Sequence, residues 1–332
     1  MRAIASVDDL MDRAPLRAAF FLFLAPGFLA EVLSENTPLL TALHPAPFLL
    51  LILTYGVPVV LIREFAVARR LNVVGIILLG IGYGILNEGV LAKTLTLPGG
   101  LPIAEFAGYG KLGTVQTGWA IFILFWHALH SVLYPILLCD WLFPAGAGRR
   151  WFVTPGARRF MYLMIVSVFV LYSLYFLVRE RSDVGTFTFY VALTIALAAI
   201  AVRWCTTGDR TAARVPAPSY APAFLGAAAI FFYVFQFWSP SHIPFAGFLA
   251  LSAGTIFFAA AAMRRAGWRP LPELLLFGLG DYLTFAMLAS LLSFTSNRHG
   301  AEGVAAGVIF LLIFVYLIRA VRREPRGRMG WE

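Results

Sequence analysis

Ten apolar stretches, each about as long as a bilayer is thick, follow one another along this 332-residue chain. A helix needs about 20 apolar residues to cross the hydrocarbon core, because each residue advances it by about 1.5 Å. Sixty per cent of the residues are apolar and only 13% are charged. The stretches cover residues 16–33, 46–66, 72–92, 118–140, 159–178, 184–204, 220–238, 243–263, 271–293 and 303–320. The sequence therefore predicts an all-α polytopic integral membrane protein with about ten transmembrane helices.

The basic residues predict the orientation of these helices. With the N-terminus placed in the cytoplasm, 20 arginines fall at cytoplasmic segments, and the outer loops hold only Lys93, Lys111, Arg179, Arg181 and Arg298. Cytoplasmic loops of membrane proteins are enriched in Lys and Arg, so both the N-terminus and the C-terminus are expected in the cytoplasm. The net charge of +9 then reflects topology, and we expect no nucleic acid partner. We expect a multi-pass protein of a bacterial cytoplasmic (inner) membrane, with the first helix retained because no cleavage site follows it.

We expect one transmembrane domain over residues 1–332 and no soluble domain. Helices 1–4, in residues 1–145, contain nearly all the intramembrane ionisable side chains, and Asp281 is the main exception in helices 5–10, residues 146–332. The longest connection, residues 93–117, is only mildly polar and is punctuated by Gly and Pro. It is expected to dip into the outer leaflet or to cover the helices as a lid.

Glu88 follows Asn87 inside the apolar stretch 72–93. A carboxylate in hydrocarbon costs at least a few kcal/mol unless it is neutralised, paired or hydrated. Two interpretations remain open: a buried acid satisfied by a neighbouring helix, or a proton carrier or general acid/base. Counting along helix 3 places Glu88 roughly 24 Å from its inner end, in the outer quarter of the core, and Glu31 reaches a similar depth on helix 1.

His127 and Asp281 fall near mid-membrane on helices 4 and 9. His130 lies three residues beyond His127, which places it on nearly the same face of an α-helix. These side chains, with Glu31 and Glu88, are expected to form a polar track from the outer face toward the membrane centre. We take Glu88 and His127 as candidate catalytic residues. The candidates for a proton relay or for substrate binding are Glu31, Asn87, His130, Ser131 and Asp281. No cofactor is expected, and no metal, since a zinc site would need a third ligand and no HExxH spacing is present.

Arg63 and Glu64 lie about one turn from the cytoplasmic end of helix 2. Long charged side chains at that depth usually reach water, which predicts an interfacial pair. A role in chemistry beside Glu88 would need a re-entrant or strongly tilted helix 2. In helix 3, Gly80 and Gly84 form a small face that predicts a close helix neighbour. Both cysteines, Cys139 and Cys205, are expected to be structural and not to form a disulfide.

Four runs of the chain, EVLSENTP, YGVPVVLIRE, GYGILNEGVLAK and WHALHSVLYPILL, together with LFP at 142–144, resemble a group of uncharacterised bacterial polytopic membrane proteins. This resemblance covers roughly residues 25 to 145 and implies no established activity. A fainter resemblance is to the intramembrane glutamic proteases, which include the CAAX-protease/bacteriocin-processing family and PrsW-type proteases. Those carry a paired-acid motif, an FxxxH or FxxxE motif and an HxxxN or HxxxD motif on separate helices. Here the corresponding positions are Arg63-Glu64, Tyr83 to Asn87 and His127 to Ser131, with no paired glutamates.

Three functions are compatible with these patterns. An enzyme would use Glu88 and His127 for general acid/base chemistry on a lipid-like or peptide substrate that enters from the bilayer. A proton- or cation-coupled secondary transporter would use the same acids and histidines as ion sites between two halves of five helices. A non-catalytic membrane scaffold would pair every intramembrane charge locally. Membrane lipids and a small-molecule or peptide substrate are the expected partners, and the oligomeric state is left open.

Overall fold

The computed structural model describes residues 7–34, 36–96, 104–174, 184–206, 219–235, 239–265, 272–296 and 300–323. Within them it confirms an all-α membrane protein, with eight helices long and apolar enough to cross a bilayer. Two further predicted spans correspond to shorter apolar helical stretches, Ala221–Ile230 and Phe245–Phe257. The two chain ends lie outside the described residues, as do Arg179, Arg181 and Arg298 of the predicted outer loops.

Each of the first four spans contains a π-helical segment. The first consists of α1 (Val7–Gly27) and the π segment η1 (Phe28–Val32). The short helix α2 (Leu39–Ala42) follows. The second span consists of α3 (Pro45–Leu51), η2 (Ile52–Gly56) and α4 (Val57–Ala68). The third consists of α5 (Val73–Leu86) and η3 (Asn87–Leu91). The fourth consists of α6 (Thr117–Trp126), η6 (His127–Leu133) and α7 (Tyr134–Leu142).

The second half of the chain has regular helices. These are α8 (Pro155–Ser173), α9 (Val184–Trp204), α10 (Ala221–Phe235), the short α11 (Ser239–His242), α12 (Phe245–Arg265), α13 (Pro272–Ser296) and α14 (Gly300–Arg323). The connection between α5 and α6 contains a 3₁₀ turn, η5 (Ala104–Phe106), and a small hairpin of β1 (Lys111–Leu112) and β2 (Val115–Gln116). In the described residues, β1 and β2 pair with each other and form a two-stranded sheet.

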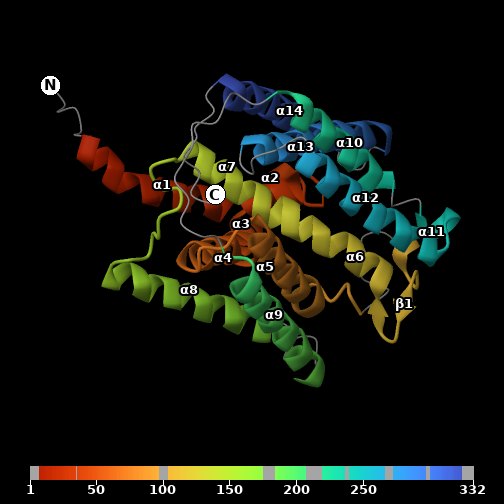
Figure 1. The fold of residues 1–332 in the computed structure, drawn as a ribbon, viewed down its shortest axis with the longest axis horizontal. Coiled ribbons are helices and arrows are strands. Elements are labelled where there is room, and N and C mark those ends of the chain that lie inside the picture. The colour runs from red at the N-terminus through yellow and green to blue at the C-terminus, as the bar shows by residue number, and fades with distance from the viewer. Residues whose placement is uncertain are drawn as a thin grey trace.

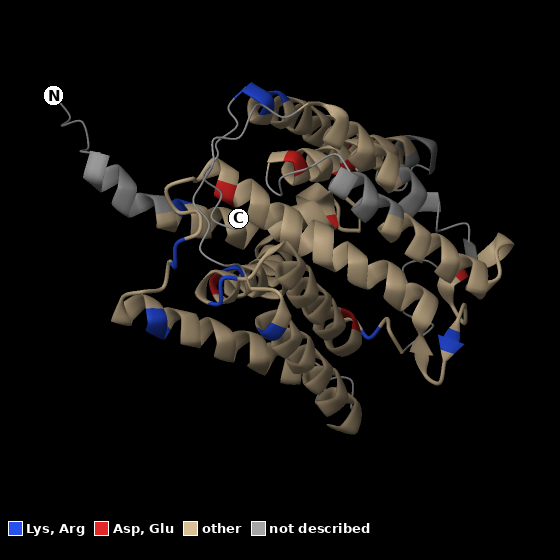
Figure 2. Cartoon of the chain, viewed as in Figure 1, with Lys and Arg blue, Asp and Glu red and all other residues tan. Residues whose placement is uncertain are grey.

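The fourth span lies at the centre of the molecule, between two groups of helices (Figure 1). On one side are α5, which packs against η6 and α9, and α4, which packs against α8. On the other side α13 packs against α10, α14 and α7. Lys and Arg lie mostly at helix ends and in connections, whereas several acidic residues lie within the helical bundle (Figure 2).

The glycines of α5 bring it close to the fourth span. A Cβ atom at Gly80 would lie 2.7 Å from Cα of Ala128, and one at Gly84 would lie 3.1 Å from Cβ of His127. Both positions therefore need the small residue that the sequence contains. The predicted close approach of helix 3 to a neighbour is confirmed, and it places the end of α5 directly beside His127.

Candidate functional site

Glu88 and His127 form a buried pair across the third and fourth spans. Oε1 of Glu88 lies 2.8 Å from Nε2 of His127, and the two residues are 7% and 1% exposed. A carboxylate beside an imidazolium, or a carboxylic acid beside a neutral imidazole, carries no net charge as a pair. This neutrality offsets the cost of placing either charge in hydrocarbon.

The other polar atoms of this pair are also held. Nδ1 of His127 lies 3.1 Å from Oγ of Ser131, one turn along the same span. Oε2 of Glu88 accepts a short hydrogen bond from the Thr94 hydroxyl. That hydroxyl in turn accepts a hydrogen bond from Nε1 of Trp119 at 2.8 Å. The histidine and the carboxylate are therefore each oriented by a second partner.

The described part of the connection between α5 and α6 covers the pair, as the apolar character of residues 93–117 predicts. Thr94 and Leu95 are buried, and the Leu95 carbonyl accepts a hydrogen bond from the backbone N–H of Gln116 at 2.8 Å. Phe106 is fully buried and packs against the rings of Trp119 and Phe122. The part of this connection at 97–103 lies outside the described residues.

A second carboxylate reaches the pair through a tyrosine. Tyr55 donates a short hydrogen bond to Oε1 of Glu31, and its ring centroid lies 6.0 Å from that of His127. Thr37 donates to the other oxygen of Glu31 at 3.3 Å. Glu31 is only partly buried, whereas Tyr55 is buried. Glu31 and Glu88, the two acids of the expected polar track, are thus connected through the neighbouring rings of Tyr55 and His127.

Tyr83 completes the surroundings of His127. Its ring is 5.3 Å from the imidazole in an edge-to-face arrangement, and its hydroxyl accepts a hydrogen bond from the Asn87 amide at 3.4 Å. Asn87 thus lies beside the pair and makes its contact through Tyr83.

In two spans a proline follows the π-helical segment closely and leaves a backbone carbonyl without its helical partner. The proline that follows η2, Pro58, has no N–H to bond the carbonyl of Thr54, four residues earlier. That carbonyl accepts the Tyr83 hydroxyl at 2.8 Å instead. In the fourth span, Pro135 has no N–H for the i→i+5 bond to the His130 carbonyl, which accepts the Tyr282 hydroxyl at 2.5 Å. The prolines therefore free backbone carbonyls, and tyrosines of neighbouring helices bond to them.

His130 and Asp281 form a separate pair. Nε2 of His130 lies 3.1 Å from Oδ2 of Asp281 on α13, and Tyr134 donates to the same oxygen at 3.4 Å. The expectation that His127 and His130 share a face, in one track with Asp281, is wrong. A π-helical turn holds more residues than an α-helical turn, so a step of three residues falls further short of a full turn. His127 therefore meets η3, and His130 meets α13.

Arg63 and Glu64 do not reach water as predicted. Arg63 is fully buried and Glu64 is 3% exposed. The segment after α7 folds back over this helix end: Nη2 of Arg63 donates to the Gly146 carbonyl at 2.7 Å, and Trp151 donates its N–H to Glu64 at 2.8 Å. Nη2 also lies 3.5 Å from Oδ1 of Asp140. These contacts lie where the C-terminal end of α4 meets the segment after α7, so the pair is a local structural cluster.

The structure thus gathers five of the seven candidate residues: Glu31, Asn87, Glu88, His127 and Ser131. It places His130 and Asp281 in a second cluster. Tyr55, Thr94 and Trp119 complete the site but were not predicted from the sequence, where isolated polar and aromatic residues resemble ordinary packing residues. Tyr83 entered only as a motif position in the resemblance to the glutamic proteases. Among the described residues, no three His, Cys, Asp or Glu side chains gather closely enough to hold a metal ion.

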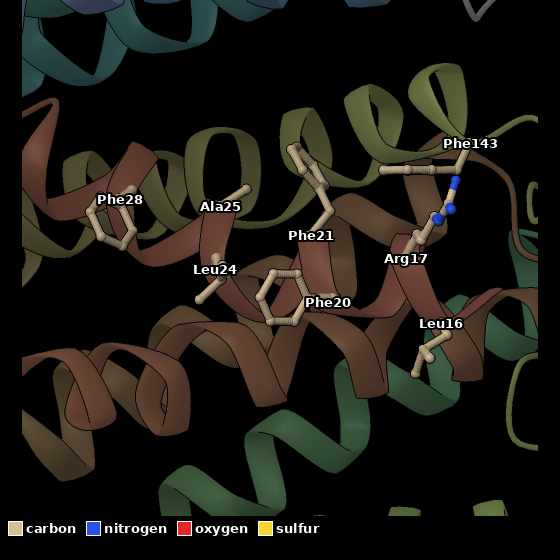
Figure 3. Close-up of a pocket in the computed structure, with 8 residues that line it drawn as sticks. All are labelled: Leu16, Arg17, Phe20, Phe21, Leu24, Ala25, Phe28 and Phe143. Carbon is tan, nitrogen blue, oxygen red and sulfur yellow. The ribbon is translucent and has the colours of Figure 1, made fainter. Parts of the chain in front are cut away.

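An open apolar groove of about 790 Å³ runs along α1 (Figure 3). Arg17 lies at one end and Phe28, the first residue of η1, lies at the other. The residues between them that line the groove are Phe20, Phe21, Leu24 and Ala25, joined by Leu16 and by Phe143 from beyond α7. The groove therefore ends three residues before Glu31.

Comparison with known proteins gives one result. A family model described as an uncharacterized membrane protein family matches residues 20–325. No curated protein and no solved structure matches the chain.

Proposed function

The chain belongs to this uncharacterized family of membrane proteins, and we propose that it is an intramembrane enzyme whose acid–base centre is the Glu88–His127 pair. The observation that carries the proposal is the 2.8 Å contact between these two side chains, each fixed by a second partner. A carboxylate and an imidazole in direct contact, each held in one orientation, are suitable groups for general acid/base chemistry. We place the protein in a bacterial cytoplasmic membrane.

The proposed reaction is hydrolysis of an ester or amide. Glu88 takes a proton from a water molecule whose oxygen attacks the carbonyl carbon. The leaving oxygen or nitrogen takes a proton back from the pair as its bond to carbon breaks, so the pair ends with the proton count it began with. His127 supports the charge that Glu88 loses and regains, and Ser131 holds the imidazole in one orientation.

A lipid-like substrate fits the groove along α1 better than a peptide does. The groove along α1 offers apolar side chains and one arginine, and it ends beside η1. An acyl chain needs only carbon contacts, whereas the N–H and C=O groups of an extended peptide in hydrocarbon would each need a partner. Entry along α1 would bring a chain toward Glu31 and Tyr55.

The test is turnover by purified protein in liposomes made from total bacterial lipid, followed by mass spectrometry of the lipids. We expect loss of a lipid ester and release of its acid or alcohol with the wild type. Glu88→Gln should reduce this rate by at least a hundredfold, since general acid–base groups typically contribute 10²–10⁴. Glu105→Gln, which alters an exposed acid on the outer connection, is the matched control. Equal rates in Glu88→Gln and wild type would refute the assignment.

A proton-coupled transporter is the second candidate, favoured by the presence of two histidine–carboxylate pairs on one span. It would give proton flux across sealed vesicles, read by an internal pH-sensitive dye, without chemical change in any lipid. A scaffold would show neither activity. The local pairing of Arg63 with Glu64 and Asp140 is compatible with a scaffold as well as with an enzyme or transporter.

A further inference from the structure

A second groove, of about 590 Å³, lies between the cytoplasmic ends of α4 and α9. Two arginines, Arg69 and Arg203, stand at it. Its apolar lining consists of Phe65, Ile195, Ala198, Ala199 and Val202. Ala198 and Ala199 on α9 are small, so the groove stays open where larger side chains would fill it.

The backbone fixes the two arginines relative to one another. Immediately after Arg69, Leu71 forms an isolated β-bridge with Thr206, and the backbone N–H of Asn72 donates to the Cys205 carbonyl at 2.8 Å. This connection joins the ends of α4 and α9 two or three residues from each arginine. The groove is therefore a built feature of the fold, held open between two tied helix ends.

Its level in the membrane matches phospholipid headgroups. Both arginines belong to the cytoplasmic set counted from the sequence, and Trp204, next to Arg203, is 70% exposed. Exposed tryptophans of membrane proteins concentrate at the boundary between hydrocarbon and headgroups. The apolar lining continues from Arg203 toward Ile195, which extends roughly 12 Å into the core along α9.

We propose that this groove binds an anionic phospholipid of the cytoplasmic leaflet. The lipid phosphate contacts Arg69 and Arg203, and one acyl chain lies over Ala198 and Ala199. Guanidinium groups bind phosphate with paired, charge-assisted hydrogen bonds. Basic pockets between membrane helices on this side are suited to anionic headgroups, and a zwitterionic lipid gains less because its own cation offsets the phosphate. Among its lining residues, the α1 groove has Arg17 alone as a basic residue.

The experiment is native mass spectrometry of the full-length protein in detergent, titrated with phosphatidylglycerol or phosphatidylcholine. We expect preferential binding of phosphatidylglycerol by the wild type. The double variant Arg69→Gln/Arg203→Gln should weaken it roughly thirtyfold, since two basic contacts are lost. The matched control is Arg158→Gln/Arg159→Gln, which removes the same charge from exposed arginines near the start of α8. These arginines are expected on the same side of the membrane as the groove.

A third variant separates the groove from surface charge. Ala198→Phe keeps both arginines but fills the space for the acyl chain, and it should also weaken phosphatidylglycerol binding. This variant gives the answer if the double arginine variant fails to fold. Equal weakening by the α8 control, unchanged binding in Ala198→Phe, equal binding of both lipids, or tight binding of inorganic phosphate alone would each overturn the proposal.

Discussion

Replacement of Arg63 by alanine is expected to destabilise the fold strongly. The guanidinium is fully buried and lies 3.0 Å from Glu64 and 3.5 Å from Asp140. It also donates to the carbonyls of Gly146 and Arg149 at 2.7 and 2.5 Å. Its removal leaves two carboxylates in a buried site without their shared cation.

The magnitude follows from that loss. Removing one partner of a buried ion pair typically costs about 3–5 kcal/mol, because the remaining charge is left uncompensated. The guanidinium also lies 3.8 Å over the Trp151 ring, so alanine leaves a space there as well. We therefore expect Arg63→Ala to lower the free energy of unfolding by about 3–5 kcal/mol.

The same reasoning predicts that stability is partly restored when the three charges of the cluster are removed together. The triple variant Arg63→Met, Glu64→Gln and Asp140→Asn keeps most of the volume and removes the three buried charges of this cluster. Neutral replacements of buried ion clusters are often tolerated, so its loss should be less than about half that of Arg63→Ala. Unfolding by sodium dodecyl sulfate in mixed micelles, followed by tryptophan fluorescence, measures both variants. The exposed Arg158→Ala serves as control and should change stability by no more than about 0.5 kcal/mol. The reasoning fails if Arg63→Ala is as stable as that control, or if the triple variant is as unstable as Arg63→Ala.

Two further substitutions test the packing of the fourth span by the same unfolding assay. Gly80→Ala should cost about 1–3 kcal/mol, because the new Cβ would lie 2.7 Å from the Ala128 backbone. Gly254→Ala, whose Cβ would meet nothing within 4 Å, should instead be neutral or stabilising. Similar changes in stability for both variants would contradict the close approach. Asp281→Ala should cost about 1–3 kcal/mol because it removes the partner of His130, whereas Asp281→Asn keeps an acceptor and should cost less. Equal losses in the two Asp281 variants would show that the acceptor does not matter.

The membrane fold was predictable because the bilayer imposes a length on every span. The predicted apolar stretch 184–204 has the same bounds as α9 (Val184–Trp204). The glycines of α5 also predicted a close neighbour, since only small residues permit such an approach. What the apolar pattern did not give was the path of the segment after α7. That segment covers Arg63 with backbone carbonyls, and carbonyl positions leave no trace in residue type.

The contact between Glu88 and His127 was partly predictable, because helix counting placed His127 near mid-membrane and Glu88 above it on one polar track. The split between His127 and His130 was not, because the count assumed 3.6 residues in every turn. Each of the first four spans instead has a π-helical segment, and these contain Glu31, Tyr55, Glu88 and His127. One widened turn rotates the residues that follow it relative to those before. In η6 that rotation is what lets a single span present one histidine to Glu88 and the other to Asp281. Segments of this kind occur frequently at functional sites, and their coincidence with the polar residues supports the Glu88–His127 pair as the centre of activity.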